Sequence, residues 1–394
     1  MRLAFAITAG LALVALVAIG QEPAGQEVQV SGIACWGSVS NALLEIRPLA
    51  GKGRVDRTIL RVGEKFNGVE VITIDPRQGV VRAKVDGVES AFPIDGTPVS
   101  AGGSSLNLRA ANSLQVLELY QELSRRTLLR SGNLPAATMD LQEPGMFDAP
   151  AAARALESAF TEKGIALKPV GDKFVCAVRI EDEAVLDALP ALPAEAARPE
   201  PSELLPAGLL KFQEADILQA MDVYQELAAR TVLRAPLLRG KVTVRSQTFL
   251  TRAEAIWLME AAVQLAGTRV VADGEKFSIA VPLEKNPPVV RANSRVRPEN
   301  ERTLPPGLLK FSDADPATVL AFYAKLCGRQ AGAMGGIPPA KFSIRTQTSL
   351  TTSECLHGLD VLAALHGLEF VPVAEDKITL RNRPEAADTA PVPK

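Results

Sequence analysis

The stretch LPAGLLKF at residues 205–212 decides the fold, because it returns as LPPGLLKF at residues 304–311. The stretch QTFLT at residues 247–251 returns as QTSLT at residues 347–351, again about 100 residues later. Self-similarity at a fixed spacing is typical of a chain built from repeated structural units. The second half of the chain therefore contains two copies of one unit.

A third, more degenerate copy precedes these two and begins near Leu106. Its stretch LYQEL at residues 119–123 matches VYQEL at residues 223–227. Its end, DKF at residues 172–174, matches EKF at residues 275–277. We refer to the three copies in chain order as the first, second and third repeats.

The three tyrosines of the chain all fall at one position of the repeat. They are Tyr120, Tyr224 and Tyr323. In the second repeat this position belongs to an apolar stripe with the spacing of a helix, formed by Ile217, Met221, Tyr224, Leu227 and Thr231. A residue on such a stripe is more often part of a core than of a ligand site. We expect a buried ring in each repeat, with the hydroxyl reaching a strand end.

Each repeat is predicted to be an α+β unit with the order strand, helix, strand, helix and hairpin. In the second repeat, residues 241–246 alternate polar and apolar side chains as a half-buried strand does. Thr251 and Glu254 form a capping box that begins the second helix, and Gly267 ends it. Residues 268–281 then form a hairpin. We predict a small sheet with two helices on one face.

Composition divides the chain further. Residues 28–97 show no helical period but several short apolar runs separated by turn residues, which predicts a small all-β domain. The predicted repeats span residues 104–181, 204–282 and 304–382, and the predicted linkers span 182–203 and 283–303; residues 383–394 form a tail predicted to be disordered. The first linker is rich in Pro and Ala, and as polyproline II it could separate its neighbours by roughly 40 Å. We therefore expect the second and third repeats to fold independently.

The N-terminal residues 1–21 resemble an export signal. Residues 3–19 are almost wholly apolar and follow Arg2. As a helix these residues would span roughly 26 Å, slightly less than the hydrocarbon core of a membrane, so a cleaved signal and an inner-membrane anchor both remain open. Either reading predicts export to the periplasm, with membrane contact only through this segment.

The charged residues do not suggest a catalytic or nucleic-acid-binding protein. The 394 residues carry a net charge of −2, and no basic stretch is long enough to follow a phosphate backbone. The two histidines, His357 and His366, are nine residues apart and lie on different faces of a predicted helix, so they do not form a zinc site. Asp216 and Asp315 lie where helices begin, which favours a structural role. We expect no catalytic residue, cofactor or metal.

Two cysteines of the third repeat are predicted to be neighbours. Cys327 and Cys355 align with Ala228 and Ala255, which are small residues on the inner faces of the two helices. Two alternatives follow for an exported protein, a disulfide or two buried thiols that act as small apolar residues.

The second and third repeats resemble the periplasmic N-terminal repeats of secretins over about 180 residues. The resemblance rests on the shared LLKF, on Ala215-Asp216 and Ala314-Asp315 before the first helix, and on GKVTV at residues 240–244. It implies a KH-like α/β fold without an active site, in modules that stack side by side into rings. A secretin also has a long β-rich gate domain, whereas only a short polar tail follows Leu380. The chain is therefore not expected to be the pore.

The β domain resembles the small β domain of the inner-membrane clamp protein of type II secretion and its type IV pilus relative. The resemblance rests on residues 59–75, with VSGI at residues 30–33 ahead of them. In that family the domain touches the first periplasmic domain of the secretin.

These features predict a non-enzymatic adaptor that links inner-membrane components to a separate secretin in a type II secretion or type IV pilus-like machine. Partners would be a secretin, inner-membrane assembly proteins, or further copies of the chain in a ring. The predicted contact is a strand edge formed by Lys241, Val242, Thr243, Val244, Arg245 and Ser246. The alternative is a periplasmic module that binds peptide or peptidoglycan.

Overall fold

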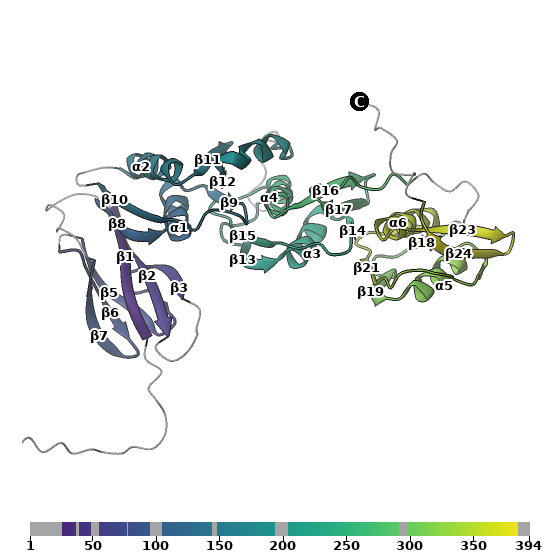
Figure 1. The fold of residues 1–394 in the computed structure, drawn as a ribbon, viewed down its shortest axis with the longest axis horizontal. Helices are drawn as coiled ribbons and strands as arrows, with labels where there is room; N and C mark the ends of the chain where they lie inside the picture. Colours follow the sequence, from purple (N-terminus) through teal and green to yellow (C-terminus); the bar gives the residue numbers. More distant parts are fainter. Residues whose placement is uncertain are drawn as a thin grey trace, which may run out of the picture. The chain divides into compact units, whose positions relative to one another are not determined.

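The computed structural model describes residues 26–36, 39–48, 55–76, 78–94, 105–143, 148–193, 204–290, 298 and 300–384 (Figure 1). It divides into two compact units, and residues up to Ala111 and from Asp140 to Met146 form the first. The predicted export segment, residues 194–203 and 291–297 of the predicted linkers, and most of the predicted tail lie outside the described residues.

The first unit is all-β, as predicted. It contains a five-stranded sheet of order β10-β8-β1-β2-β3 and a four-stranded sheet of order β4-β5-β6-β7. Apolar side chains from both sheets, such as Val30, Leu44, Val71 and Val81, form one core. The strands are β1 (Gln26–Trp36), β2 (Val39–Pro48), β3 (Asp56–Arg61), β4 (Lys65–Phe66), β5 (Val69–Asp75), β6 (Val80–Val85), β7 (Val88–Pro93), β8 (Ser105–Asn112) and β10 (Thr138–Glu143).

Two strands of this unit belong in sequence to the first repeat. β8 is the strand that precedes the first helix of that repeat, and it pairs antiparallel with β1, with Gly32 opposite Leu108 and Ala34 opposite Leu106. The sequence places a boundary near residue 100, yet β1 and β8 are neighbours in one sheet. Strand pairing across a Gly- and Ser-rich stretch leaves no local signal in the sequence.

The second unit contains the rest of the first repeat and all described parts of the other two. The first repeat contributes α1 (Ser113–Ser124), β9 (Thr127–Arg130), α2 (Ala149–Glu162), β11 (Ile165–Val170), β12 (Phe174–Arg179) and a 3-10 helix, η1 (Ile180–Ala188). The second repeat contains β13 (Lys211–Asp216), α3 (Ile217–Ala228), β14 (Thr231–Arg234), β15 (Lys241–Arg245), α4 (Arg252–Leu265), β16 (Thr268–Asp273) and β17 (Phe277–Pro282).

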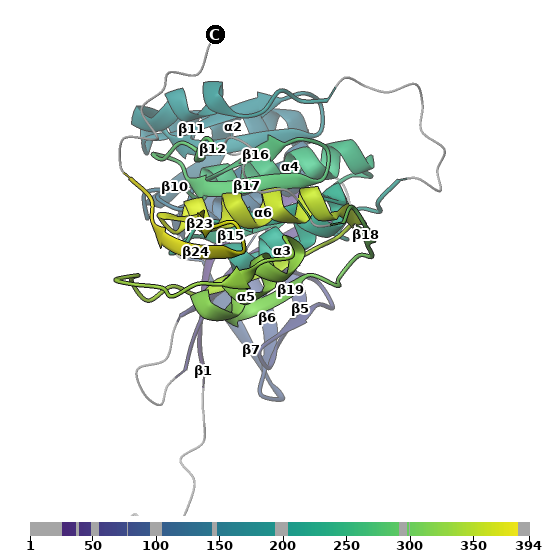
Figure 2. The same cartoon turned by 90° about the vertical axis from the view of Figure 1, so that its right-hand side faces the viewer.

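The third repeat follows the same order with two short additional strands. Its elements are β18 (Thr303–Leu304), β19 (Lys310–Ala314), α5 (Pro316–Leu326), β20 (Gln330–Ala331), β21 (Phe342–Arg345), β22 (Leu350–Thr351), α6 (Thr352–Leu365), β23 (Leu368–Ala374) and β24 (Lys377–Asn382). Figure 2 shows this repeat facing the viewer, with α6 beside β23 and β24. The mixed α+β, multidomain architecture predicted from the sequence is confirmed.

Side chains at the helix ends explain where the helices begin. Asp216 and Asp315 are N-caps whose carboxylates accept hydrogen bonds from backbone amides of the first turn. Both predicted capping boxes form, with Thr251 and Thr351 accepting from the amides of Glu254 and Glu354. The structural role predicted for the helix-start acids is therefore confirmed.

The strands of a repeat are divided among separate sheets, whereas the sequence suggested one sheet. In the second repeat, β13 pairs with β15, and a separate sheet has the order β14-β17-β16. The strand β14 was not predicted, because Thr231 fitted the helical stripe. The helix instead ends at Ala228, since Ala229 adopts a left-handed conformation with φ of 51°, and Thr231 begins a strand that runs parallel to β17.

The first predicted linker is folded where the structure describes it. Residues Ile180–Ala188 form η1, whose Leu186 joins the core of the second repeat. The Trp257 indole donates to the carbonyl oxygen of Pro190 at 2.8 Å, and the Gln264 amide donates to that of Ala188 at 2.7 Å. Residues 182–193 therefore do not form an extended spacer, because their backbone carbonyls and apolar side chains bind the next repeat.

Candidate functional site: the junctions between repeats

The tyrosine shared by the repeats is a core residue, as predicted. The predicted contact of its hydroxyl with a strand end forms in the second repeat, where the Tyr224 and Ser278 hydroxyls are 3.2 Å apart at the start of β17, and in all three repeats the hydroxyl also binds a carboxylate. The rings of Tyr120, Tyr224 and Tyr323 are buried. Each hydroxyl donates to a carboxylate on the second helix of its own repeat, at 2.7–2.9 Å, and these carboxylates belong to Glu157, Glu260 and Asp360. The pair holds the two helices together and does not line a ligand site.

Burial changes the proton affinity of these pairs. Desolvation raises the pKa of Glu260, and it raises the pKa of Asp360 to about 6. Raised pKa values on acids are common at catalytic sites. Here each acid is bonded to a buried phenol of the same repeat, so its perturbation has a structural cause.

In the first and second repeats, the outer face of the three-stranded sheet packs on the following repeat. Leu129, Phe174, Cys176 and Val178 of the first repeat join the core of the second repeat. The equivalent residues of the second repeat, Leu233, Phe277, Ile279 and Val281, join the core of the third repeat. We call these two contacts the first and second junctions. Because each repeat buries apolar side chains in its neighbour, the prediction of independently folding repeats disagrees with this packing.

Polar contacts also recur at both junctions. Lys173 pairs with Glu254 at 2.8 Å in the first junction, and Lys276 pairs with Glu354 at 2.7 Å in the second. These glutamates are the capping-box residues of α4 and α6, so one carboxylate both caps a helix and binds the preceding repeat.

A backbone contact is repeated in the same way. The amide of Gln247 donates to the hydroxyl of Thr127 at 3.0 Å, and the amide of Gln347 donates to that of Thr231 at 3.1 Å. The sequence contains one signal for the junctions, the pair Lys-Phe. Lys-Phe ends the first two repeats at residues 173–174 and 276–277, and the third repeat has Asp376-Lys377 in its place.

One position differs between the junctions. In the first junction Trp257 packs on Phe174, with ring centroids 4.7 Å apart. In the second junction His357 occupies this position, 6.0 Å from the ring of Phe277, and its Nε2 lies 2.8 Å from a carboxylate oxygen of Asp273. This hydrogen bond raises the pKa of His357. The second junction therefore contains a titratable contact at the position where the first has an indole ring.

The strand predicted to bind a partner is engaged within the chain. Residues 241–245 form β15, which pairs on one side with β13. From the first repeat, the Arg130 guanidinium donates to the Thr243 hydroxyl at 3.2 Å, and the Gln121 amide donates to the Arg245 carbonyl oxygen at 3.5 Å. Ser246 is buried. These residues thus contribute to the first junction.

The two cysteines of the third repeat are buried free thiols. Cys355 lies in α6, and Cys327 lies at the end of α5, within the same apolar core. Burial raises the pKa of Cys327 to about 12 and that of Cys355 to about 11. Both thiols therefore remain protonated and act as small apolar side chains at neutral pH.

The second histidine also has an intramolecular environment. The ring of His366 packs against Phe342 at the end of α6, with centroids 4.5 Å apart. Within the described part of the chain, no group of three or more His, Cys, Asp or Glu side chains is arranged to hold a metal ion.

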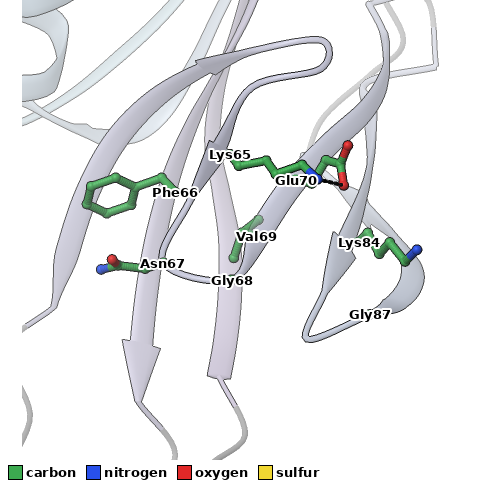
Figure 3. Close-up of a pocket in the computed structure, with 8 residues that line it drawn as sticks. All are labelled: Lys65, Phe66, Asn67, Gly68, Val69, Glu70, Lys84 and Gly87. Carbon is green, nitrogen blue, oxygen red and sulfur yellow. Dashed lines mark ion pairs between the residues drawn. The ribbon is translucent and has the colours of Figure 1, made fainter.

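The described surface has a hollow in each of the two compact units. In the first unit, the β4–β5 turn borders a hollow of about 380 Å³, and Figure 3 shows Lys65 reaching Glu70 beside it, 2.9 Å apart. A second hollow of about 480 Å³ lies at the first junction and is lined by residues that include Asn133, Asp182 and Gln264. Three of these polar side chains are bonded within the chain, since Asn133 donates to Asp182 at 2.8 Å and Gln264 donates to the Ala188 carbonyl oxygen at 2.7 Å.

Comparison with known proteins adds little to this geometry. No protein-family model matches the chain, and no curated protein matches it. A solved structure described as "Structure of XcpQN012" is similar over 41% of this chain and 68% of that chain, with 20% sequence identity and a TM-score of 0.17. No helix in the described ranges is both long enough and apolar enough to cross a membrane. The function is therefore argued from the residues of this chain.

Proposed function

We propose that the chain is a non-enzymatic structural adaptor of a type II secretion or type IV pilus-like machine, linking inner-membrane components to a separate secretin. The observation that carries the proposal is the repeated junction. Equivalent side chains at two junctions are used to pack one repeat on the next, and this arrangement builds an extended protein-binding surface. The resemblance of the repeats to secretin N-terminal repeats is the reason for proposing a secretion or pilus machine.

The contacts of the ionisable groups support a structural role. The buried acids Glu260 and Asp360 bind tyrosines, and His357 binds Asp273 across the second junction. The capping glutamates Glu254 and Glu354 bind lysines of the preceding repeat. Each of these groups is explained by an intramolecular contact, so no catalytic role is needed to account for it.

The periplasm is the proposed location. The apolar residues 3–19 following Arg2 support it, since this layout directs export. The β domain would then meet its partner on the periplasmic side of the inner membrane, as the resemblance to the clamp protein implies. Its exposed apolar side chains, Val62 at 54% and Val88 at 67% exposure, are the places where such a contact would be sought.

A second candidate function has one observation in its favour. The hollow at the first junction is shared by two repeats and is lined by both polar and apolar residues, as a site for a peptide or a peptidoglycan fragment would be. The scaffold is preferred because Asn133, Asp182 and Gln264 are bonded within the chain. Slower tumbling or chemical-shift changes at these residues on addition of a soluble muropeptide would favour the second candidate.

Photo-cross-linking in the living cell tests the adaptor. A photoreactive amino acid placed at Val62 or Val88 of the full chain is expected to capture a secretin or an inner-membrane assembly protein, and loss of the chain is expected to stop secretion or piliation. The exposed Leu237 of the second repeat serves as the matched control position. Deletion of the β domain is a poor test, because β1 pairs with β8 and its removal would disturb the first repeat.

The outcome that contradicts the adaptor is equally specific. If neither β-domain position captures a secretion or pilus component, and a strain without the chain secretes and assembles pili normally, the proposal fails.

A further inference from the structure

One strand edge of the repeat is occupied in the first repeat and free in the other two. In the first repeat, β8 pairs with β10 on one side and with β1 on the other. In the second repeat, β13 pairs only with β15 among the described strands, and in the third, β19 pairs only with β21. The edges of β13 and β19 that correspond to the β1 side of β8 therefore have no strand beside them in the described part of the chain.

The equivalence of these strands rests on a shared bulge. The residue with a left-handed backbone is Ala110 in β8, Glu214 in β13 and Asp313 in β19, with φ between 45° and 52°. In each case its amide donates to a side chain of the adjacent strand: Asp140, Thr243 and Ser343 respectively, at 2.8–3.0 Å. A bulge of this kind commonly limits pairing at a sheet edge. In the first repeat β1 nevertheless pairs with residues 105–108, ahead of the bulge.

This alignment identifies the free edge as residues 209–212 and 308–311. The Leu210 carbonyl accepts from the Ser246 amide at 3.0 Å, on the β15 side. Successive residues of an antiparallel strand direct their backbone groups to opposite sides, so the amide and carbonyl of Lys211 face the free edge. The Leu309 carbonyl likewise accepts from Thr346 at 3.2 Å, which places the backbone groups of Lys310 on the free edge. Their equivalent in the first repeat, Asn107, pairs with Ile33 of β1.

The side chains beside this edge are exposed. Leu209 and Leu308, at the same repeat position, are 55% and 57% exposed. A large apolar side chain that is exposed at the same place in two repeats is typical of a binding surface. β13 and β19 are also shorter than β8 at this end. β8 begins at the position equivalent to Leu209, whereas β13 and β19 begin two residues later.

We propose that the free edges of β13 and β19 each bind an extended, antiparallel strand of a partner protein, in the manner in which β1 binds β8. The inference rests on the proposed function only in taking the partner to be a protein of the same machine. Main-chain hydrogen bonds to the amide and carbonyl groups of Lys211 and Lys310 provide the binding. Both strand starts lengthen to match β8, which releases the Leu209 and Leu308 amides from the carbonyl oxygens of Pro206 and Pro305.

The first repeat also indicates the sequence of the bound strand. The β1 residues opposite Leu106 and Leu108 are small: a Cβ atom added to Gly32 would lie 2.8 Å from Leu108, and Ala34 is buried opposite Leu106. The bound strand therefore has Gly or Ala opposite Phe212 and Leu210. Between them, a carboxylate opposite Lys211 or Lys310 forms a cross-strand ion pair, and an apolar residue packs on Leu209 or Leu308.

The test uses the full chain and a synthetic peptide that copies residues 29–36 of β1 with Ile33→Glu and Cys35→Leu. These changes place a carboxylate opposite the lysine and an apolar side chain opposite the leucine. Amide hydrogen exchange followed by NMR is expected to slow about tenfold or more at Lys211 and Lys310 when the peptide is added. The same peptide with proline at its glutamate position is the control and is expected to have no effect, because it cannot donate to the edge.

Variants of the chain provide the second arm. Leu209→Asp with Leu308→Asp alters only exposed side chains and is expected to weaken peptide binding about tenfold or more without changing the melting temperature. Exchange that slows only at Asn107, or a peptide that binds the double variant equally well, overturns the inference. Self-association of the full chain that the double variant abolishes also overturns it, because the edge would then bind a second copy. If Lys211 and Lys310 exchange no more slowly with the peptide while Val62 or Val88 still captures a secretion component, this inference fails and the proposed function stands.

Discussion

β17 of the second repeat and β24 of the third occupy the same place in their sheets, yet they are buried differently. In β17, with the sequence FSIAVP, the first five residues are buried on both faces of the sheet. In β24, with the sequence KITLRN, only Ile378 and Leu380 are buried. One face of β17 packs within its own repeat and the other packs in the second junction, whereas β24 has a core on one face only.

The comparison shows that a few side chains determine whether a repeat packs on a following repeat or presents a polar outer face. Phe277, Ile279 and Val281 correspond to Lys377, Thr379 and Arg381 of the third repeat. A strand buried on both faces has a continuous apolar sequence, and a strand with one wet face alternates. The third repeat therefore closes the series of junctions, as terminal repeats with a polar outer face do in other repeat proteins.

The largest expected effect comes from placing a charge in the buried face of β17. Phe277→Asp removes an apolar side chain from the second junction and buries a carboxylate without a partner, which we expect to destabilise the second and third repeats by about 3–5 kcal/mol. Lys377→Asp is the matched control at the equivalent exposed position, where we expect a change within about 0.5 kcal/mol. Denaturant unfolding of both variants checks the prediction, and equal effects would remove the distinction between the two strands.

A smaller effect is expected from pH, and only at the second junction. The pKa of His357 is raised by its hydrogen bond to Asp273, so its contribution to stability is complete below the unfolded value near 6.5 and is lost as pH rises through the folded value. We expect His357→Gln to cost about 1 kcal/mol near pH 6 and less near pH 9. The charged groups that act on His357 are Asp273 and Asp360, and both raise its pKa.

Two features make this pH measurement specific. Burial lowers the pKa of His366, so the effect of pH on stability through His366 has the opposite sign to that through His357. Burial also raises the pKa of Asp360 to about 6, so Asp360 changes the stability mainly between about pH 4 and 6. Subtracting the variant from the unaltered chain at each pH cancels the contribution of His366. Asp360 interacts with His357, so its response to the substitution is part of the difference that is measured. Trp257→Phe at the first junction is the control and is expected to cost the same at pH 6 and pH 9. A pH-dependent cost there would contradict the assignment to His357.

The smallest effect is expected from the ion pair of the second junction. Lys276 and Glu354 are each 34% exposed, so solvent screens their interaction. A double-mutant cycle with Lys276→Met and Glu354→Gln is expected to give a coupling energy of about 0.5 kcal/mol, lost in high salt. A coupling that salt leaves unchanged would show that the pair is more than a screened surface contact.

Much of the local structure could be predicted from the sequence, because it depends on neighbouring residues. The capping boxes at Thr251 and Thr351, the hairpin that turns after Asp273, and the buried tyrosines all follow from spacing alone. The predictions that differ from the structure concern contacts between distant segments. No local pattern reports that the Trp257 indole binds the Pro190 carbonyl, or that β1 pairs with β8.

The candidate site was predicted less completely, for a related reason. Residues 241–246 were recognised as an alternating strand, but the sequence does not say that Arg130 and Gln121 of the first repeat already bind it. The sequence does contain a signal for the junctions. FVCAVR and FSIAVP are continuously buried strands, whereas KITLRN alternates buried and exposed residues. That signal becomes clear only when the three repeats are aligned by strand pairing.

Hydrogen exchange in β17 tests the central claim, that the repeats fold as neighbours coupled through their sheets, most directly. Amide protection of Phe277–Pro282 is measured in the full chain and in a chain that ends at residue 290 and so lacks the third repeat. Loss of the apolar cover over Phe277 and Ile279 is expected to lower protection by about 100-fold or more, since each buried side chain contributes about 1.5–3 kcal/mol. Unchanged protection of β17 in the shortened chain would show that the repeats are independent and would contradict the account.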